Sequence, residues 1–88
     1  MTAAAVLLLT SSGAVKTRPC LLYSVVLTAT GAAQISVKDG GTSGTEIVGL
    51  ALAGAGSVVF APGVGVAIGT SLWVTVDSGT VEVAVVYG

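Results

Sequence analysis

Charged side chains are absent from two long tracts of this sequence. Ile47–Val76 runs for thirty residues and Pro19–Val37 for nineteen residues without a Lys, Arg, Asp or Glu. Only 8% of all residues are charged, against about 25% in an average soluble domain. Because so few charges cannot cover an ordinary soluble surface, the chain must bury much of its exterior against other proteins or present it to lipid.

The two uncharged tracts have the length of membrane-spanning helices, since about 20 apolar residues cross a bilayer, but their contents favour strands. Ile47–Val76 holds six glycines and Pro62, and it is rich in β-branched residues, which favour strands over helices. Thr28, Thr30 and Gln34 interrupt the other tract. We therefore expect the glycines to serve turns and bulges, and a small membrane-associated protein is the less favoured alternative.

The N-terminal apolar run Ala3–Leu9 has the hydrophobicity of a signal-peptide core, but no Lys or Arg precedes it. Cys20 follows Lys16–Pro19 rather than the small and aliphatic residues that precede a lipid-modified cysteine. We expect neither cleavage nor lipidation, and we expect residues 1–13 to form an arm or a first strand. The single cysteine cannot form an internal disulfide, so it is interpreted as a small buried hydrophobe.

Two-residue alternation of apolar and polar side chains, with turns about ten residues apart, dominates the chain. The strongest predicted strand is Cys20–Thr28, with Leu21, Tyr23, Val25 and Leu27 on one face. Both faces of this strand are largely apolar, which is typical of a central strand or of one at an interface.

Two loops are the clearest connections in the sequence. Asp39–Gly44 combines an aspartate with three glycines, a composition that favours a hairpin because glycine adopts positive φ without strain. Asp77–Gly79 joins Leu72–Val76 to Thr80–Tyr87, and we predict that these last two strands form an antiparallel hairpin.

The pattern of about eight short strands and no convincing helix predicts an all-β protein. We expect a small antiparallel β-sandwich or jelly-roll-like fold in which residues 14–88 form a single domain.

The composition argues against an enzyme, because the chain has no His, no Asn, one Cys and one Gln. Nucleophilic catalysis needs a base beside the nucleophile, and zinc, haem and iron–sulfur sites lack ligands here. Asp39, Glu46, Asp77 and Glu82 are interpreted as solvated acids in or beside turns or on exposed strand positions. A calcium site from Asp39 and Glu46 would lack the dense acidic spacing of calcium loops. We expect no cofactor and no metal.

The net charge of −1 provides no electrostatic footprint for nucleic acid and no attraction to a membrane surface. Lys16 and Arg18 form the only basic cluster of the sequence. They fit two interpretations: contacts to an acidic partner or a neighbouring subunit, or charges that together with Pro19 protect a sheet edge from pairing.

Aromatic residues supply the remaining candidates for binding. Trp73 alternates with Leu72, Val74 and Val76, so if those residues are core, Trp73 points toward a second apolar surface and can anchor an interface. The full set of predicted interface residues is Lys16, Arg18, Tyr23, Trp73 and Tyr87.

The order of several segments resembles that of a known family. The segments are Val15–Leu27, the Asp39–Gly40 turn, the Phe60–Gly63 turn, the Leu72–Val76 strand and the closing Tyr87. Over about residues 15–88 they resemble small structural proteins of tailed bacteriophages, particularly capsid cement or decoration proteins. The resemblance implies a compact β-fold, often a trimer, that binds the capsid surface and braces the major capsid protein or another virion protein. A phage tail, fibre or adaptor component is the alternative.

Overall fold

A computed structural model describes residues 4–88 of the chain, so Met1–Ala3 of the predicted arm lie outside the described residues. Residues 4–88 form nine antiparallel strands and no helix. The strands are β1 (Ala5–Leu9), β2 (Gly13–Lys16), β3 (Cys20–Ala29), β4 (Ala33–Asp39), β5 (Thr45–Leu52), β6 (Gly56–Phe60), β7 (Val66–Ile68), β8 (Leu72–Ser78) and β9 (Val81–Tyr87). This confirms the predicted all-β class.

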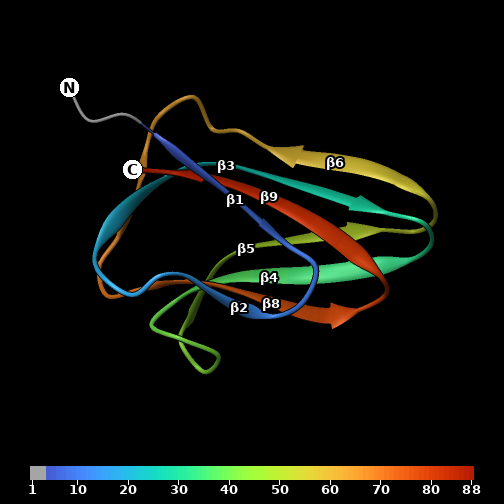
Figure 1. Cartoon of the computed structure of the whole chain (residues 1–88), viewed down its shortest axis with the longest axis horizontal. Coiled ribbons are helices and arrows are strands. Elements are labelled where there is room, and N and C mark those ends of the chain that lie inside the picture. Colours follow the sequence, from blue (N-terminus) through green and yellow to red (C-terminus); the bar gives the residue numbers. More distant parts are fainter. Residues whose placement is uncertain (1–3) are drawn as a thin grey trace.

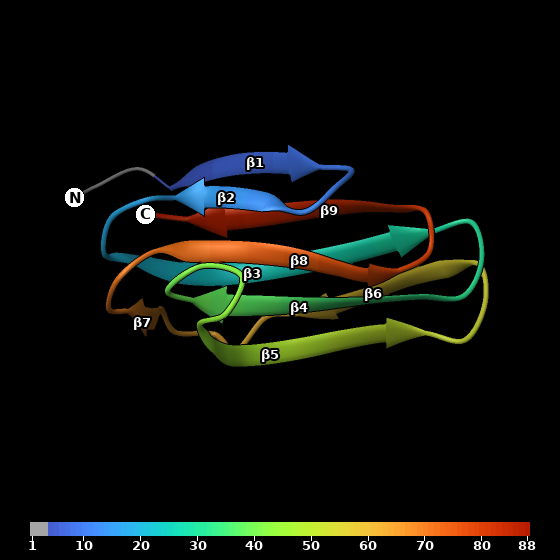
Figure 2. The ribbon, with the colours of Figure 1, turned by 90° about the horizontal axis from the view of Figure 1, so that it is seen from below.

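The strands form two sheets that pack face to face as a sandwich (Figure 1). Sheet A has the order β1-β9-β3-β6, and β7 pairs with the remaining length of β3. Sheet B has the order β2-β8-β4-β5. Seen from below, β1 and β2 lie along one long side of the sandwich and β5 along the other (Figure 2). The molecule measures 37 × 26 × 18 Å.

The loop Asp39–Gly44 does connect a hairpin, because β4 and β5 pair from Ala33↔Leu52 to Asp39↔Thr45. Gly40 and Gly41 have φ of 107° and 100°, which is the left-handed region that the loop composition predicted.

The predicted hairpin at the end of the chain is wrong, because β8 belongs to sheet B and β9 to sheet A. Each of these strands has one fully buried side, carrying Val74 on β8 and Val83 on β9. The two strands lie on opposite sides of the core, so Val74 and Val83 face it from different sheets. Alternation within each strand is the same in both arrangements, so the sequence pattern alone does not separate them.

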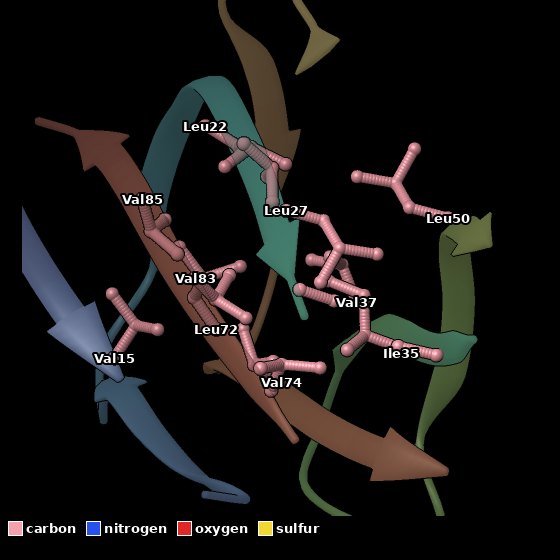
Figure 3. Packing of buried hydrophobic residues seen from close by; sticks show 14 of the residues in the cluster. Val15, Leu22, Leu27, Ile35, Val37, Leu50, Leu72, Val74, Val83 and Val85 are labelled. Atoms are coloured by element: carbon pink, nitrogen blue, oxygen red, sulfur yellow. The ribbon is translucent and has the colours of Figure 1, made fainter. Parts of the chain in front are cut away.

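The core lies between the two sheets and is built from aliphatic side chains (Figure 3). Its fully buried large side chains are Leu22, Val25, Leu27, Ile35, Val37, Leu72, Val74, Val83 and Val85. They come from the two central strands of each sheet. The edge strand β1 contributes partly buried residues to the margin of this core.

A β-bulge changes the predicted faces of β3. The pairing of β3 with β9 shifts register between Leu22 and Ser24, so the strict alternation expected over Cys20–Thr28 breaks at Tyr23. Leu22 therefore points into the core together with Val25 and Leu27. The extra residue of a bulge turns the following side chains over, which explains why Leu21 and Tyr23 do not share a face with Val25 as predicted.

Candidate interaction surfaces

The outer face of sheet A has apolar residues on all four of its principal strands, and its polar residues are Ser24, Thr28, Ser57 and Glu82. We define this face by Val6, Leu8, Val26, Val59, Ala84 and Val86. One row of paired residues runs Leu8↔Ala84, Ala84↔Val26 and Val26↔Val59, from one edge of the sheet to the other. The side chains of Val6, Leu8 and Val59 are 64%, 60% and 58% exposed. Water therefore contacts a continuous apolar surface here.

The apolar surface continues toward the end of sheet A where β3 begins. Leu21 and Tyr23 on β3 and Val64 between β6 and β7 are exposed there. Tyr23 packs closely against two glycines, because a Cβ at Gly65 would lie 3.2 Å from the ring and one at Gly88 3.0 Å from it. All six exposed large hydrophobic residues found within residues 4–88 thus belong to sheet A or to its β6–β7 connection.

The charged side chains are concentrated on the other sheet. Sheet B carries Lys16, Lys38, Asp39, Glu46 and Asp77. Within residues 4–88, Glu82 is the one charged residue on the strands of sheet A. Arg18 lies exposed in the connection from β2 to β3. The two sheets therefore present different surfaces: sheet B carries most of the charges, and the outer face of sheet A is mostly apolar with Glu82 at one end.

Polar contacts also mark the outer face of sheet B. Ser36, buried to 6% exposure, donates its hydroxyl to Asp77 Oδ2 at 2.6 Å. Trp73 is half-buried on the same face, where its cross-strand neighbours are Ala14 and Lys38. The second surface to which Trp73 points is therefore the polar one, not an apolar one.

Asp39 is accessible to solvent, as its position in the sequence suggested, but its carboxylate is also bound by a neighbouring connection. Its carboxylate accepts backbone N–H bonds from Gly69 at 2.8 Å, Thr70 at 2.9 Å and Ser71 at 3.2 Å. These bonds, that from Gly69 foremost, hold the pKa of the Asp39 carboxyl below its usual range. The carboxylate ties the end of β4 to the β7–β8 connection, so its role in this structure is to close a loop.

Lys16 and Tyr87 meet at the side of the sandwich where β1 and β2 lie. The Lys16 Nζ is 5.9 Å from the centroid of the Tyr87 ring, within reach of a cation–π interaction. Tyr87 packs against the core from the end of β9. Lys16 lies on β2, an edge strand of sheet B, where a charge of this kind opposes edge-to-edge pairing.

The five predicted interface residues do not converge on one surface. Tyr23 lies on sheet A, Trp73 on the outer face of sheet B, and Lys16 with Tyr87 at the β1–β2 side. The sequence interpretation missed Val6, Leu8 and Val59, which expose the most surface among the strand hydrophobics. The sequence of β1 did contain a signal for an exposed apolar surface, because a strand that is apolar at every position places apolar side chains on both of its faces.

Groups able to do chemistry are sparse in this structure. Burial raises the pKa of the Cys20 thiol, although nearby Lys16 lowers it in part, so the thiol is a weak nucleophile near neutral pH. No group of three potential metal ligands occurs within residues 4–88. A shallow pocket of about 250 Å³ lies where β3 ends and β9 begins. Its lining residues are Thr10, Thr28, Ala29, Thr30, Thr80, Val81 and Glu82.

The described part of the chain contains no helix long and apolar enough to span a membrane. No protein-family model matches the sequence, and comparisons with curated proteins and with solved structures found no significant match.

Proposed function

We propose that this protein is a non-enzymatic structural subunit of a virus particle, of the capsid cement or decoration type, which binds the capsid surface. The observation that carries the proposal is the division of the surface, with exposed apolar residues on sheet A and charges on sheet B. Monomeric soluble proteins rarely expose a large contiguous apolar surface unless it binds a partner. The sequence resemblance to tailed-phage structural proteins supplies the kind of particle.

The outer face of sheet A is the surface that we assign to the capsid shell. Its six defining residues carry no charge or hydrogen-bonding side chain, so we expect the shell surface that meets them to be apolar as well. Glu82 and Thr28 lie at one end of the same face and would meet polar groups at its margin. A charged partner surface would lose its hydration without gaining a partner charge. The charged sheet B then faces solvent and keeps the decorated particle soluble.

Repetition on a shell explains why one small face suffices. The face spans four strands about 4.8 Å apart. Its area is therefore smaller than the roughly 800 Å² that each partner buries in a stable isolated complex. Many copies held on one particle, or several copies joined in an oligomer, add their weak contacts through avidity. The resemblance implies a homotrimer as that oligomer. A phage tail, fibre or adaptor component would use the same face on a different partner.

Co-expression with the major capsid protein of the same genome tests this proposal. We expect the wild-type protein to co-purify with assembled shells, and Val59→Asp to be lost from them because it places a charge on the outer face of sheet A. Gln34→Asp is the matched control, since Gln34 is exposed on β4 of sheet B. Equal retention of both variants, or shells that never contain the wild-type protein, would contradict the proposal.

A further inference from the structure

The free edge of β1 is the least protected strand edge of this molecule. In sheet A, β1 is the terminal strand and pairs only with β9, over Ala5↔Tyr87 to Leu9↔Val83. Its other side presents backbone N–H and C=O groups that no described strand pairs. Unpaired edge groups of this kind are a template for pairing with another chain.

The other three sheet edges carry features that oppose such pairing. Lys16 lies on β2 and Glu46 on β5, the two edge strands of sheet B. The remaining edge is formed by β6 and β7. β6 packs beside β5 and is followed by Pro62 two residues after its end, and β7 is only three residues long, which also limits pairing. Charges and proline are the usual protection of edge strands, whereas β1, with the sequence Ala-Val-Leu-Leu-Leu, contains neither.

We propose that β1 pairs antiparallel with β1 of a second copy of this chain, so that two sheets A join into one continuous sheet. A two-fold axis perpendicular to the sheet and passing beside Leu7 pairs all five residues of β1 with β1 of the partner subunit. It places Val6 opposite Leu8 of the partner subunit and Leu7 opposite Leu7 of the partner subunit. Directly opposed residues in an antiparallel pair lie on the same face, so apolar residues meet on both faces.

The packing of β1 shows what this pairing would bury. Val6 and Leu8 are 64% and 60% exposed on the outer face, and Leu7 and Leu9 are only partly buried at the margin of the core. Each of the four would gain apolar neighbours from the second copy. The contact is also self-limiting, because joining two β1 edges leaves neither of them free.

The available edges favour a dimer over the trimer that the resemblance implies. A three-fold ring built by edge pairing needs two different edges that fit each other. The second edge of sheet A consists of β6, which already lies beside β5, and the three-residue β7. Pairing of like edges closes with two copies. This inference does not depend on the proposed function, since it concerns the edge of sheet A and not its outer face.

Paired substitutions on the two edge strands of sheet A test the inference. Val6→Asp puts carboxylates beside the proposed junction, whereas Val59→Asp makes the same change on β6, at 58% exposure and away from the junction. Light scattering coupled to size exclusion should show wild type and Val59→Asp at twice the 8.5 kDa chain mass. Val6→Asp should weaken the dimer by about tenfold or more, since it replaces an apolar cross-strand contact and brings two like charges near each other across the junction.

The other outcomes overturn the inference. A wild-type monomer or trimer excludes the β1 dimer, and loss of the dimer in both variants shows association through the outer face. Retention of the dimer in both variants assigns it to another surface. Failure of shell binding with an intact β1 dimer would refute the proposed function alone.

Disulfide trapping measures the register without requiring a destabilising charge. In a Cys20→Ser background, Leu7→Cys should give a covalent dimer on mild oxidation, because directly opposed strand residues have Cα atoms about 4.5–5.5 Å apart. Val59→Cys is the control, since the two β6 strands would lie about 34 Å apart, seven strand spacings across the joined sheet. Equal trapping at both positions, or none with Leu7→Cys, would contradict the register.

Discussion

The side chain of Asp39 fixes the conformation of the β7–β8 connection. A single carboxylate accepts three consecutive backbone N–H groups, and the neighbouring Gly40 N–H donates to Ser71 O at 3.0 Å. Lys38 adds a bond from Nζ to Thr42 O at 2.8 Å. These contacts hold the β4–β5 loop and the β7–β8 connection together at one end of the sandwich.

Acidification should destabilise the protein partly through Asp39. The pKa of this carboxyl is lower in the folded protein than in the unfolded chain. The carboxylate therefore contributes to the stability of the fold at pH values above its unfolded pKa of about 3.9. This contribution is lost as the pH falls through the folded pKa. We expect Asp39→Asn to lower the thermal midpoint at pH 7, since the amide NH₂ opposes one backbone donor, and to flatten the loss of stability below about pH 4. Thermal melts monitored by circular dichroism between pH 2 and 7 measure both effects.

Glu46→Gln provides the control for this experiment, because Glu46 is an exposed acid on the neighbouring β5. An identical pH dependence of stability in wild type and Asp39→Asn would show that the three backbone bonds contribute nothing in solution.

The connections between strands decide which sheet each strand joins. The chain changes sheet between β1 and β2, β2 and β3, β3 and β4, β5 and β6, β7 and β8, and β8 and β9. Among the strands of residues 4–88, β4–β5 alone is a hairpin within one sheet. The crossing from β8 to β9 is tight, because Gly79 has φ of 88° and lies against Ala32 and Ala33.

Gly79→Ala should therefore destabilise the fold. A Cβ at this position would lie 2.5 Å from Ala32 O and 2.7 Å from the Ala33 Cβ, and alanine is strained at this positive φ. We expect a loss of about 1–3 kcal/mol in the free energy of unfolding, measured by urea titration. Gly54→Ala is the matched control, because a Cβ at Gly54 meets no atom within 4 Å. Equal stability of the two variants would refute this account of the crossing.

The whole molecule is stabilised by one thin aliphatic core. A chain of this size buries only about 60–65% of its unfolded surface, and small domains keep a narrow margin of stability. The fully buried side chains come from both sheets, so loss of any large one weakens the contact between the two layers. The surface left outside this core is divided between the apolar sheet A and the charged sheet B.

Leu27→Ala tests the core at its centre. Leu27 is fully buried on β3, and we expect the cavity to lower the free energy of unfolding by about 2–5 kcal/mol in chemical denaturation. Val59→Ala, at an exposed position of the same sheet, should change it by no more than about 0.5 kcal/mol. Comparable losses in the two variants would mean that the outer face of sheet A is itself buried in solution, by a second copy.

The strands were predictable from the sequence, because alternation and turn residues are local properties. The Asp39–Gly44 hairpin and the apolar strands on either side of it followed from composition and two-residue periodicity alone. The interaction surfaces were less predictable. Val6, Leu8 and Val59 lie far apart in sequence and share a face only because β1, β9, β3 and β6 are neighbours in sheet A.

The sequence therefore determined the all-β class, since a period of two holds in any arrangement of the strands, and its scarcity of charge predicts a surface that a partner covers. The partners of each strand depend on long-range packing instead. The bulge at Tyr23 and the bonds to Asp39 join segments distant in the chain. The consecutive strands β8 and β9 separate because each pairs with strands distant in the sequence. Burial of apolar faces across the sandwich selected that arrangement, and with it the apolar outer face and the free edge of β1.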